Sequence, residues 1–260
     1  GANNADGGYT IVSNTNSTVA EVAEAKGIMT QTSNGFTVEE MTSAAGNVNT
    51  ASMVCWQWKG SGQGTGVGTD VSESGNNPGF KRQTNATAGF STILYTGTGA
   101  AGTIAHGLNS APKFMMIKSG IVSHWAVYFG GSTTGIDHTD YGRLNTTAGW
   151  LDSSAYWNDT AATSSVFTVN TSHKVNKDAT GHIAYVWAEV QGYSKFANYT
   201  GNGNANGPFV PLGFKPAWVM IKQATDSSSG DGWHILDNTR DPHNPNTGKL
   251  FADSTTYEGT

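Results

Sequence analysis

The sequence predicts an all-β protein made of tandem antiparallel β-sandwich repeats, jelly-roll-like in topology and about 100 residues each. Composition is the first observation behind this prediction. Gly supplies 34 of the 260 residues, and charged residues are 13 %, about half of the usual ~25 %. Thr, Asn, Ser and Gly are abundant instead, which is typical of short strands joined by tight turns.

The second observation is an internal repeat, which identifies architecture directly. Residues 95–118 (YTGTGAAGTIAHGLNSAPKFMMIK) are matched without a gap by residues 199–222 (YTGNGNANGPFVPLGFKPAWVMIK). The two stretches share a Tyr, a TGxG turn, a Leu, a Pro and a closing Ile-Lys. In the TGxG turns, Gly is expected where the backbone needs a positive φ.

A looser echo relates the first 60 residues to the end of the repeat. NGFTV (34–38) resembles SVFTV (165–169), and the same spacing aligns Trp56 with Trp187. The chain therefore divides into four parts: 1–60, the C-terminal part of a first unit; 61–89, a Gly-rich linker; 90–192, a complete second unit; and 193–260, the N-terminal part of a third. We expect it to be a segment of a longer protein.

Strands follow from the apolar patterns in chain order. Residues 36–38 and 167–169 (FTV) are short β runs, while 113–118 (KFMMIK) and 217–222 (AWVMIK) carry apolar residues on both faces. Residues 183–190 alternate large and small side chains. A single helix is expected at 19–27 (VAEVAEAKG). The expected structural core contains Phe36, Trp56, Met116, Phe167, Tyr185, Trp187 and Met220.

We expect the linker at 61–89 to be loosely held and the junction between the second and third units to be tightly packed. Residues 61–89 have Phe80 as their one large apolar residue, so we expect a spacer that is ordered by a neighbouring subunit. The second and third units are joined almost directly, and Tyr193 and Phe196 are expected at a buried apolar seam between them. Cys55 alternates with Met53 on a predicted strand and is expected to be a small buried hydrophobe.

No catalytic or metal-binding constellation is evident. The seven His residues form neither HxxxH nor HExxH, and the acid–His stretches 136–142 and 237–243 fall in predicted loops, where Asp caps turns. GxSxG is missing, and the Gly-rich run 60–68 lacks the Lys-Ser/Thr of a phosphate loop. We therefore predict no catalytic residue, no metal, no cofactor and no enzymatic activity.

Aromatic side chains remain as candidates for ligand contact. Trp150 and Trp157 have no counterpart in the other units, so they are the residues expected to be exposed for recognition. The net charge of −5 comes without a basic cluster, which argues against nucleic-acid binding. No apolar run of about 20 residues is present, so membrane insertion is not expected.

The repeated motif also resembles a known family. YTGNG…GPFV…GF.PAWVMIK, preceded by AYVWAEVQGYSKF, is similar to an uncharacterised tandem-repeat domain in large virion proteins of marine bacteriophages, labelled tail or tail-fibre proteins. The resemblance covers residues 50–260 well and supplies no catalytic residues. It implies a place in the phage particle, with other virion proteins and copies of itself as partners in a homo-oligomer.

The resemblance leaves three functions open. The first is a structural tail fibre or appendage that contributes to host attachment. The second is a carbohydrate-binding or adhesion module that contacts host surface glycans directly, and the third is a capsid decoration protein. A depolymerase is a remote fourth, because no paired carboxylates mark a cleft.

Overall fold

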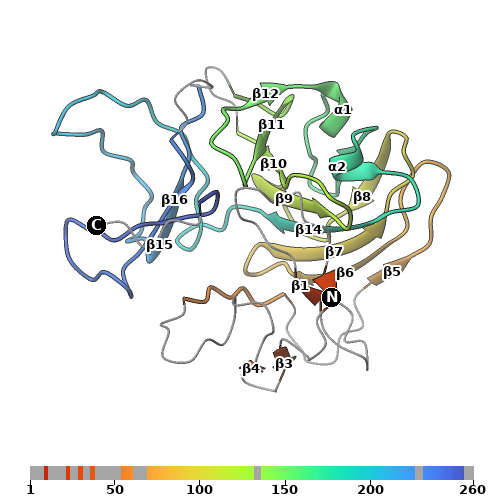
Figure 1. Ribbon diagram of the computed structural model, residues 1–260, viewed down its shortest axis with the longest axis horizontal. Coiled ribbons are helices and arrows are strands. Elements are labelled where there is room, and N and C mark those ends of the chain that lie inside the picture. The colour runs from red at the N-terminus through yellow and green to blue at the C-terminus, as the bar shows by residue number, and fades with distance from the viewer. Residues whose placement is uncertain are drawn as a thin grey trace.

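An eight-stranded antiparallel sheet forms the centre of the protein in the computed structural model (Figure 1). The structure describes residues 9–10, 22–23, 29–31, 36–38, 54–60, 69–131, 136–225 and 231–254. Across the main sheet the strands follow the order β12 (Leu151–Asp152), β11 (Asp140–Arg143), β10 (Ala126–Phe129), β9 (Phe114–Ser119), β14 (Gly181–Trp187), β7 (Phe90–Thr96), β6 (Phe80–Asn85) and β5 (Thr69–Val71).

Smaller elements surround this sheet, and all pairings are antiparallel. The paired strands are β8 (Gly102–Ala105) with β13 (Val166–Val169), β1 (Tyr9–Thr10) with β2 (Val22–Ala23), and β3 (Met29–Gln31) with β4 (Phe36–Val38). A C-terminal sheet has the order β15 (Trp218–Ile221), β16 (His234–Asp237) and β17 (Leu250–Phe251). The helices are α1 (Ser154–Trp157) and α2 (His173–Asn176). The chain is therefore all-β, as predicted.

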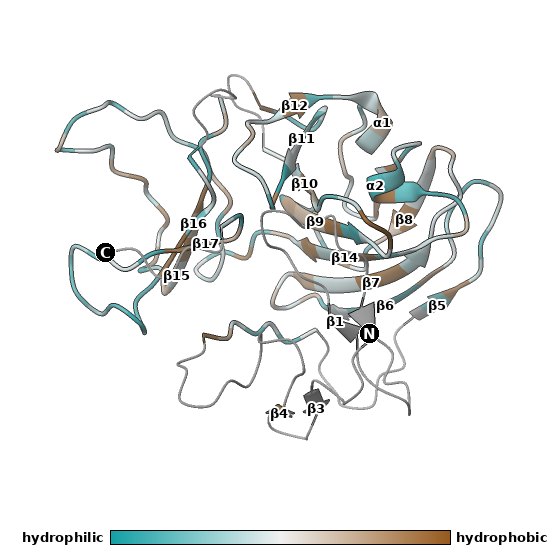
Figure 2. Cartoon of the chain, viewed as in Figure 1, coloured by the Kyte–Doolittle hydropathy of each residue, from teal (hydrophilic) through white to brown (hydrophobic). Residues whose placement is uncertain are grey.

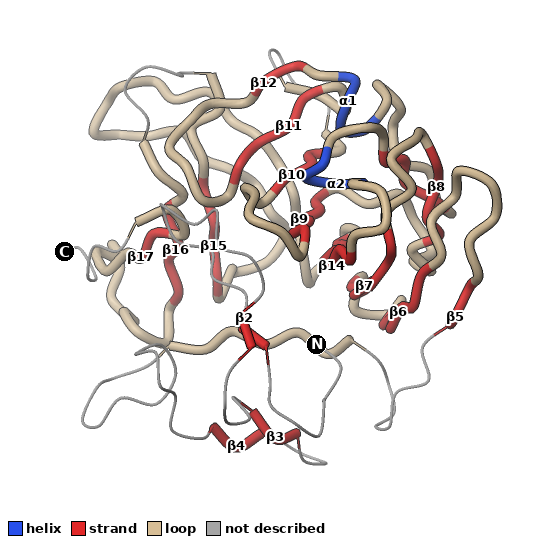
Figure 3. The backbone as a smooth tube through the Cα atoms, turned by 45° about the vertical axis from the view of Figure 1, so that its right-hand side comes forward, coloured by secondary structure: helices blue, strands red, loops and turns tan. Residues whose placement is uncertain are grey.

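Strand alternation gives the main sheet an apolar cluster on each face. Figure 2 shows the hydrophobic stretches of its central strands in brown. On the inner face, Met115, Ala184 and Ile93 pack beneath β8, β13 and the helices, together with Phe167 and Trp157. On the outer face lie the intervening residues of the same strands, including Phe114, Trp187 and Phe90. The C-terminal sheet lies on this outer side, and Figure 3 shows it beside β9 and β10.

The predicted core residues fall into three groups. Phe167 and Trp187 are buried, at 1 % and 8 % exposure. The half-buried ones are Met116, Tyr185 and Met220, which pack against the outer core, and Trp56. Phe36 lies on β4 and is 37 % exposed, so the prediction that it is a core residue is wrong.

Cys55 is also exposed, contrary to expectation. Residues 54–60 form no strand, so the alternation that would have turned Cys55 inward does not apply. The predicted helix at 19–27 is contradicted at residues 22–23, which form β2; its other residues lie outside the described part of the chain.

The predicted linker is partly wrong, because β5 and β6 both lie within 61–89. Phe80 is 6 % exposed and belongs to the inner core, where its strand pairs with β7. The turn before β6 is held from the same chain: Thr103 N donates to Asn77 Oδ1 at 2.8 Å and Thr98 Oγ1 to Asn76 O at 2.9 Å. Residues 69–89 are thus ordered by their own chain; residues 61–68 lie outside the described residues.

The repeated sequence corresponds to a repeated meander of three strands. In the first meander, Ile117 of β9 pairs with Ala126 of β10, which pairs with Arg143 of β11. In the second, Ile221 of β15 pairs with His234 of β16, which pairs with Phe251 of β17. The aligned residues Ile117 and Ile221 therefore begin similar antiparallel pairings, and the second and third strands of both meanders are paired with the same spacing.

The equivalence does not extend over the whole repeat. Residues 102–105 form β8, whereas the aligned residues 206–209 form no strand, and Phe209 is 89 % exposed. The described residues thus contain one complete set of strands and one three-stranded counterpart. None of the described helices is long and apolar enough to cross a bilayer.

Candidate functional site

A row of aromatic side chains crosses the outer face of the main sheet. Phe90 on β7, Trp187 on β14 and Phe114 on β9 are cross-strand neighbours. The ring centroids of Phe90 and Trp187 are 5.0 Å apart, and those of Phe114 and Trp187 are 5.6 Å apart. Such aromatic pairs each contribute about 0.5–1.5 kcal/mol beyond the area that they bury. The three rings are buried, so the row helps to hold together the outer core of the sheet.

The C-terminal sheet covers one end of this row through Trp233. The Trp233 ring is 3 % exposed and lies 6.4 Å from Phe114, and its Nε1 donates to Arg143 O at 2.9 Å. Phe196 stacks on Phe114 at 5.8 Å. The expected apolar seam is present and includes Phe196, but Tyr193 is 57 % exposed.

Trp58 lies at the other end of the row and remains 38 % exposed. Its ring lies 6.3 Å from Phe90, 5.7 Å from Trp187 and 5.8 Å from Trp218, so it touches both sheets. The Trp218 Nε1 atom is buried without a hydrogen-bond partner. Sequence reasoning did not select Trp58, although the WQW spacing of Trp56 and Trp58 places them on one side of an extended segment.

The edge of β15 is the second notable feature of this side. In the main sheet, β9 pairs with β10 on one edge and with β14 on the other. β15 pairs with β16, and no strand among the described residues pairs with its other edge. All four residues of β15 are half-buried. An edge of this kind presents unpaired N–H and C=O groups that can accept another strand.

The two tryptophans predicted to be exposed do not form a groove. Trp157 is 1 % exposed, and its Nε1 donates to Asp140 O at 3.0 Å, so the prediction that it is available to a ligand is wrong. Its place in α1 explains the error, because this helix covers the inner core. Trp150 is half-buried on the opposite face, with its ring 6.3 Å from Phe129 and 6.4 Å from Trp233.

The acid–His stretch at 136–142 organises a turn. Asp137 Oδ1 accepts from the backbone N and the hydroxyl of Thr139, at 2.8 and 2.7 Å, and Asp140 Oδ2 accepts from Asp137 N at 2.9 Å. These bonds from Thr139 lower the pKa of Asp137. Turn capping by Asp, as predicted, is what the geometry shows here.

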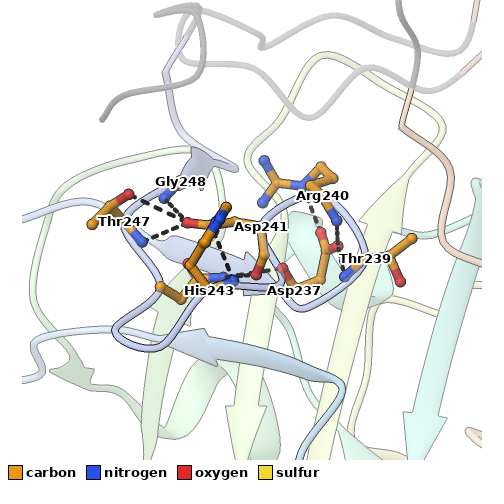
Figure 4. Close-up of polar contacts among 8 residues, drawn as sticks. Asp237, Thr239, Arg240, Asp241, His243, Thr247 and Gly248 are labelled. Atoms are coloured by element: carbon orange, nitrogen blue, oxygen red, sulfur yellow. Dashed lines mark hydrogen bonds and ion pairs between the residues drawn. The ribbon is translucent and has the colours of Figure 1, made fainter.

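The second acid–His stretch begins with another capping carboxylate, shown in Figure 4. Asp237 Oδ1 accepts from Thr239 N at 3.2 Å and Arg240 N at 2.9 Å, while Oδ2 pairs with Arg240 Nε at 2.5 Å. Burial alone would raise the pKa of Asp237, but the bonds from Arg240 and Thr239 outweigh it and lower that pKa.

Asp241 closes the rest of this loop. Its Oδ2 accepts from Gly248 N and Thr247 N, at 2.9 and 2.6 Å, and its Oδ1 from His243 Nδ1 at 2.9 Å (Figure 4). These donors hold the pKa of Asp241 well below its usual range. The carboxylate oxygens are occupied by hydrogen bonds, and within the described residues no group of three or more His, Cys, Asp or Glu could hold a metal ion.

An open cleft of about 560 Å³ lies at the far end of the main sheet. A cross-strand row lines it: Asp70, Lys81, Leu94, Ile183 and Lys118, from β5, β6, β7, β14 and β9. The Asp70–Lys81 ion pair is 3.3 Å long and mostly exposed, so it contributes little. Lys118 Nζ is already bonded to two backbone carbonyls.

Comparison with known proteins identifies one family. The family described as "Domain of unknown function (DUF7483)" matches residues 6–260. The chain belongs to this family. No curated protein and no solved structure matches it.

Proposed function

We propose that this DUF7483 chain is a non-enzymatic structural protein of a bacteriophage virion, a tail fibre or tail appendage that assembles with copies of itself and contributes to host attachment. The observation that carries the proposal is the repeated meander with an open edge. β15–β16–β17 has the register of β9–β10–β11, but the edge that β14 occupies beside β9 is unpaired beside β15 among the described residues.

The chain also holds a segment with the sequence pattern of β14. Val54, Cys55 and Trp56 align with Tyr185, Val186 and Trp187, and Val54 and Cys55 are exposed. Within the same chain this segment is held elsewhere: Lys59 O accepts from Asn85 Nδ2 at 3.2 Å, and Trp58 packs on Trp187. We infer that residues 54–56 of one copy add to the β15 edge of another.

The register of β14 on β9 predicts the geometry of this proposed contact. Trp187 faces Phe114, Val186 faces Met115 and Tyr185 faces Met116. By the same register, Trp56 of one copy faces Trp218 of the next, and Cys55 faces Val219. Strand addition of this kind gains affinity from main-chain hydrogen bonds and specificity from alternate side chains. Repeated end to end, a contact between different surfaces produces a filament or ring.

Cysteine cross-linking tests this register. Directly opposed residues of an antiparallel pair have Cβ atoms about 4.5–5.5 Å apart, close enough for a disulfide after a small adjustment. Val219→Cys should therefore form a bond with native Cys55 of a second copy under mild oxidation, giving dimers and larger species on a non-reducing gel.

Two matched variants control the experiment. Val219→Cys combined with Cys55→Ser should run as a monomer on the non-reducing gel, because the disulfide cannot form. Met220→Cys, which points to the other face, should cross-link much less. Monomers alone from Val219→Cys, or an internal bond within one chain, would refute addition between copies. Sedimentation of the unmodified chain gives an independent measure of self-association.

The alternative proposal is direct contact with host glycans. Trp58 and Trp218 support it better than Trp150 and Trp157, because Trp58 is 38 % exposed beside Trp218 and sugar rings stack on exposed aromatic faces. This surface adjoins the β15 edge, so an attachment role and an assembly role would share one side of the molecule. A decoration protein of the capsid would use the same assembly contact.

A further inference from the structure

Two stacked tyrosines on the inner side of the sheet are flanked by cations. The rings of Tyr141 on β11 and Tyr156 on α1 are stacked at 3.7 Å. The Arg143 guanidinium carbon lies 5.6 Å from the Tyr141 ring centroid, and Lys174 Nζ on α2 lies 5.9 Å from the Tyr156 ring centroid. Three separate elements, β11, α1 and α2, thus bring these four side chains together.

The positive charge of this cluster is not neutralised. No ion pair joins Arg143 or Lys174 to a carboxylate of the described residues, although both side chains are half-buried. The neighbours that act on them electrostatically are also cationic. The pKa of His124 is lowered mainly by burial, and further by Arg143, Lys174 and Lys118. The pKa of Lys174 is likewise lowered by burial first and by Arg143 second. An excess of like charge is costly in the absence of a counter-ion.

The hydrogen-bond donors of Arg143 are mostly unused. The guanidinium donates from Nη2 to Tyr141 Oη at 3.2 Å, and its Nε is buried without a partner. His124 Nδ1 is engaged by Asn145 Nδ2 at 3.0 Å, so its ring proton is on Nε2, where no described residue accepts it. A planar guanidinium with free donors matches the oxygens of a sulfate, phosphate or carboxylate group.

We propose that Arg143, supported by His124 and Lys174, binds an oxyanion of the sulfate or phosphate type. The anion supplies the acceptors that the guanidinium lacks and neutralises the cluster. Half-buried Arg143 and Lys174 remain reachable from solvent. This site does not depend on the β15 edge, and it would suit a sulfated surface polysaccharide as well as a free inorganic ion.

Calorimetry with inorganic sulfate and inorganic phosphate tests the site, with ionic strength held constant by sodium chloride. The unmodified chain should bind one anion per chain, and Arg143→Gln should weaken binding at least tenfold. Lys81→Gln is the matched control, because Lys81 is an exposed lysine on the outer face, and it should bind as the unmodified chain does. If Arg143→Gln fails to fold, Lys174→Gln should weaken binding several-fold.

Equal binding by the unmodified chain and by Arg143→Gln, or no binding by the unmodified chain, would overturn the proposal. Dextran sulfate and uncharged dextran then distinguish the sources of the anion. Tighter binding of dextran sulfate than of free sulfate, lost in Arg143→Gln, assigns the site to a sulfated polysaccharide. Binding of the free ions alone, with the same dependence on Arg143, assigns it to a small inorganic anion.

Discussion

Lys118 and Lys222 occupy equivalent places in the two meanders and make the same contact. Lys118 Nζ donates to Ser119 O and Ile121 O, both at 2.9 Å. Lys222 Nζ donates to Gln223 O at 2.8 Å and Asp231 O at 2.9 Å, and in addition to Thr147 O at 3.0 Å. Each lysine therefore satisfies the carbonyl group of the residue that follows it, which gives a physical reason for the repeated Ile-Lys.

Replacing Lys118 with Met should destabilise the protein by about 2–3 kcal/mol, because charge-assisted bonds to two carbonyls are lost at a site that is 1 % exposed. Lys222→Met should cost less, about 1 kcal/mol, because Lys222 is half-buried and water can replace its bonds. Urea denaturation of the three proteins measures both differences. Equal losses, or no loss in Lys118→Met, would contradict the role assigned to burial.

Burial of single residues was predictable on β13 and β14 but not on β4, where Phe36 is exposed. Trp187 and Phe167 lie on regular strands, so their burial followed from the pattern. The predicted exposure of Trp157 depended on its having no counterpart in the other units, which says nothing about burial. Its helix is only four residues long, too short to produce a periodic pattern in the sequence. The Arg143–Tyr141 cluster joins three elements by tertiary contact and could not be read from local sequence.

At the scale of elements, β6 shows why composition misled the prediction. Its sequence FKRQTN holds one large apolar residue. Lys81 and Gln83 are polar because the outer side is exposed, whereas Arg82 and Thr84 lie on the inner side and donate to Ala105 O and His106 O. Phe80 nevertheless packs in the inner core. By contrast, the TGxG turns behaved as expected at the second glycine: Gly99 and its counterpart Gly203 have φ values of 71° and 62°.

Phe80→Ala should therefore cost about 3–5 kcal/mol of unfolding free energy, the usual loss for a buried Phe in a packed core. A residue in a spacer would cost almost nothing. Lys81→Ala on the same strand is the control: its ion pair with Asp70 is mostly exposed and should contribute less than about 1 kcal/mol. Chemical denaturation of both variants gives the comparison, and a Phe80→Ala loss as small as that of Lys81→Ala would contradict the placement of β6.

At the scale of the whole molecule, the sequence repeat predicted a second three-stranded meander. It did not predict that this meander lacks, among the described residues, the further strands that accompany the first one. Matching apolar runs specify the same strands and register, since a slip of one residue would reverse every side chain. Residues 206–209 are aligned with β8 by the repeat spacing but form no strand. β8 is paired with β13, and no described strand of that kind accompanies the C-terminal sheet. Residues 102–105 and 206–209 therefore differ in structure: among the described residues only the former have a partner strand, and sequence spacing does not predict such long-range pairing.

Buried histidines give the whole molecule a defined response to acid. His182 is 3 % exposed, its Nδ1 bonds to Thr180 O at 2.8 Å, and its ring stacks on Tyr95 at 5.0 Å. Burial lowers the pKa of His182 from 6.5 to about 4. Burial is also the largest cause of the lowered pKa of His106, whose two ring nitrogens are satisfied by Leu108 N and Thr163 O in the neutral form.

Stability should therefore fall as the pH is lowered from 6.5 towards 4. In that window the unfolded chain binds a proton at His182 that the folded chain does not, so acid favours unfolding. The difference of about 2.5 pKa units corresponds to a loss of about 3 kcal/mol at pH 4 from His182 alone. Asp137 and Asp237, whose pKa values are lowered, contribute a separate loss at pH values below 3.8.

Urea denaturation at pH 7.0 and at pH 4.5 measures this loss, and His182→Phe isolates its origin. Phe preserves a ring against Tyr95 but takes up no proton, so the variant should be less stable at pH 7.0 and yet lose less stability on acidification. The quantity that decides is the difference between the two pH values within each protein, which cancels the fixed cost of the substitution. An unchanged difference in His182→Phe would mean that His182 is not the group that makes the fold sensitive to acid.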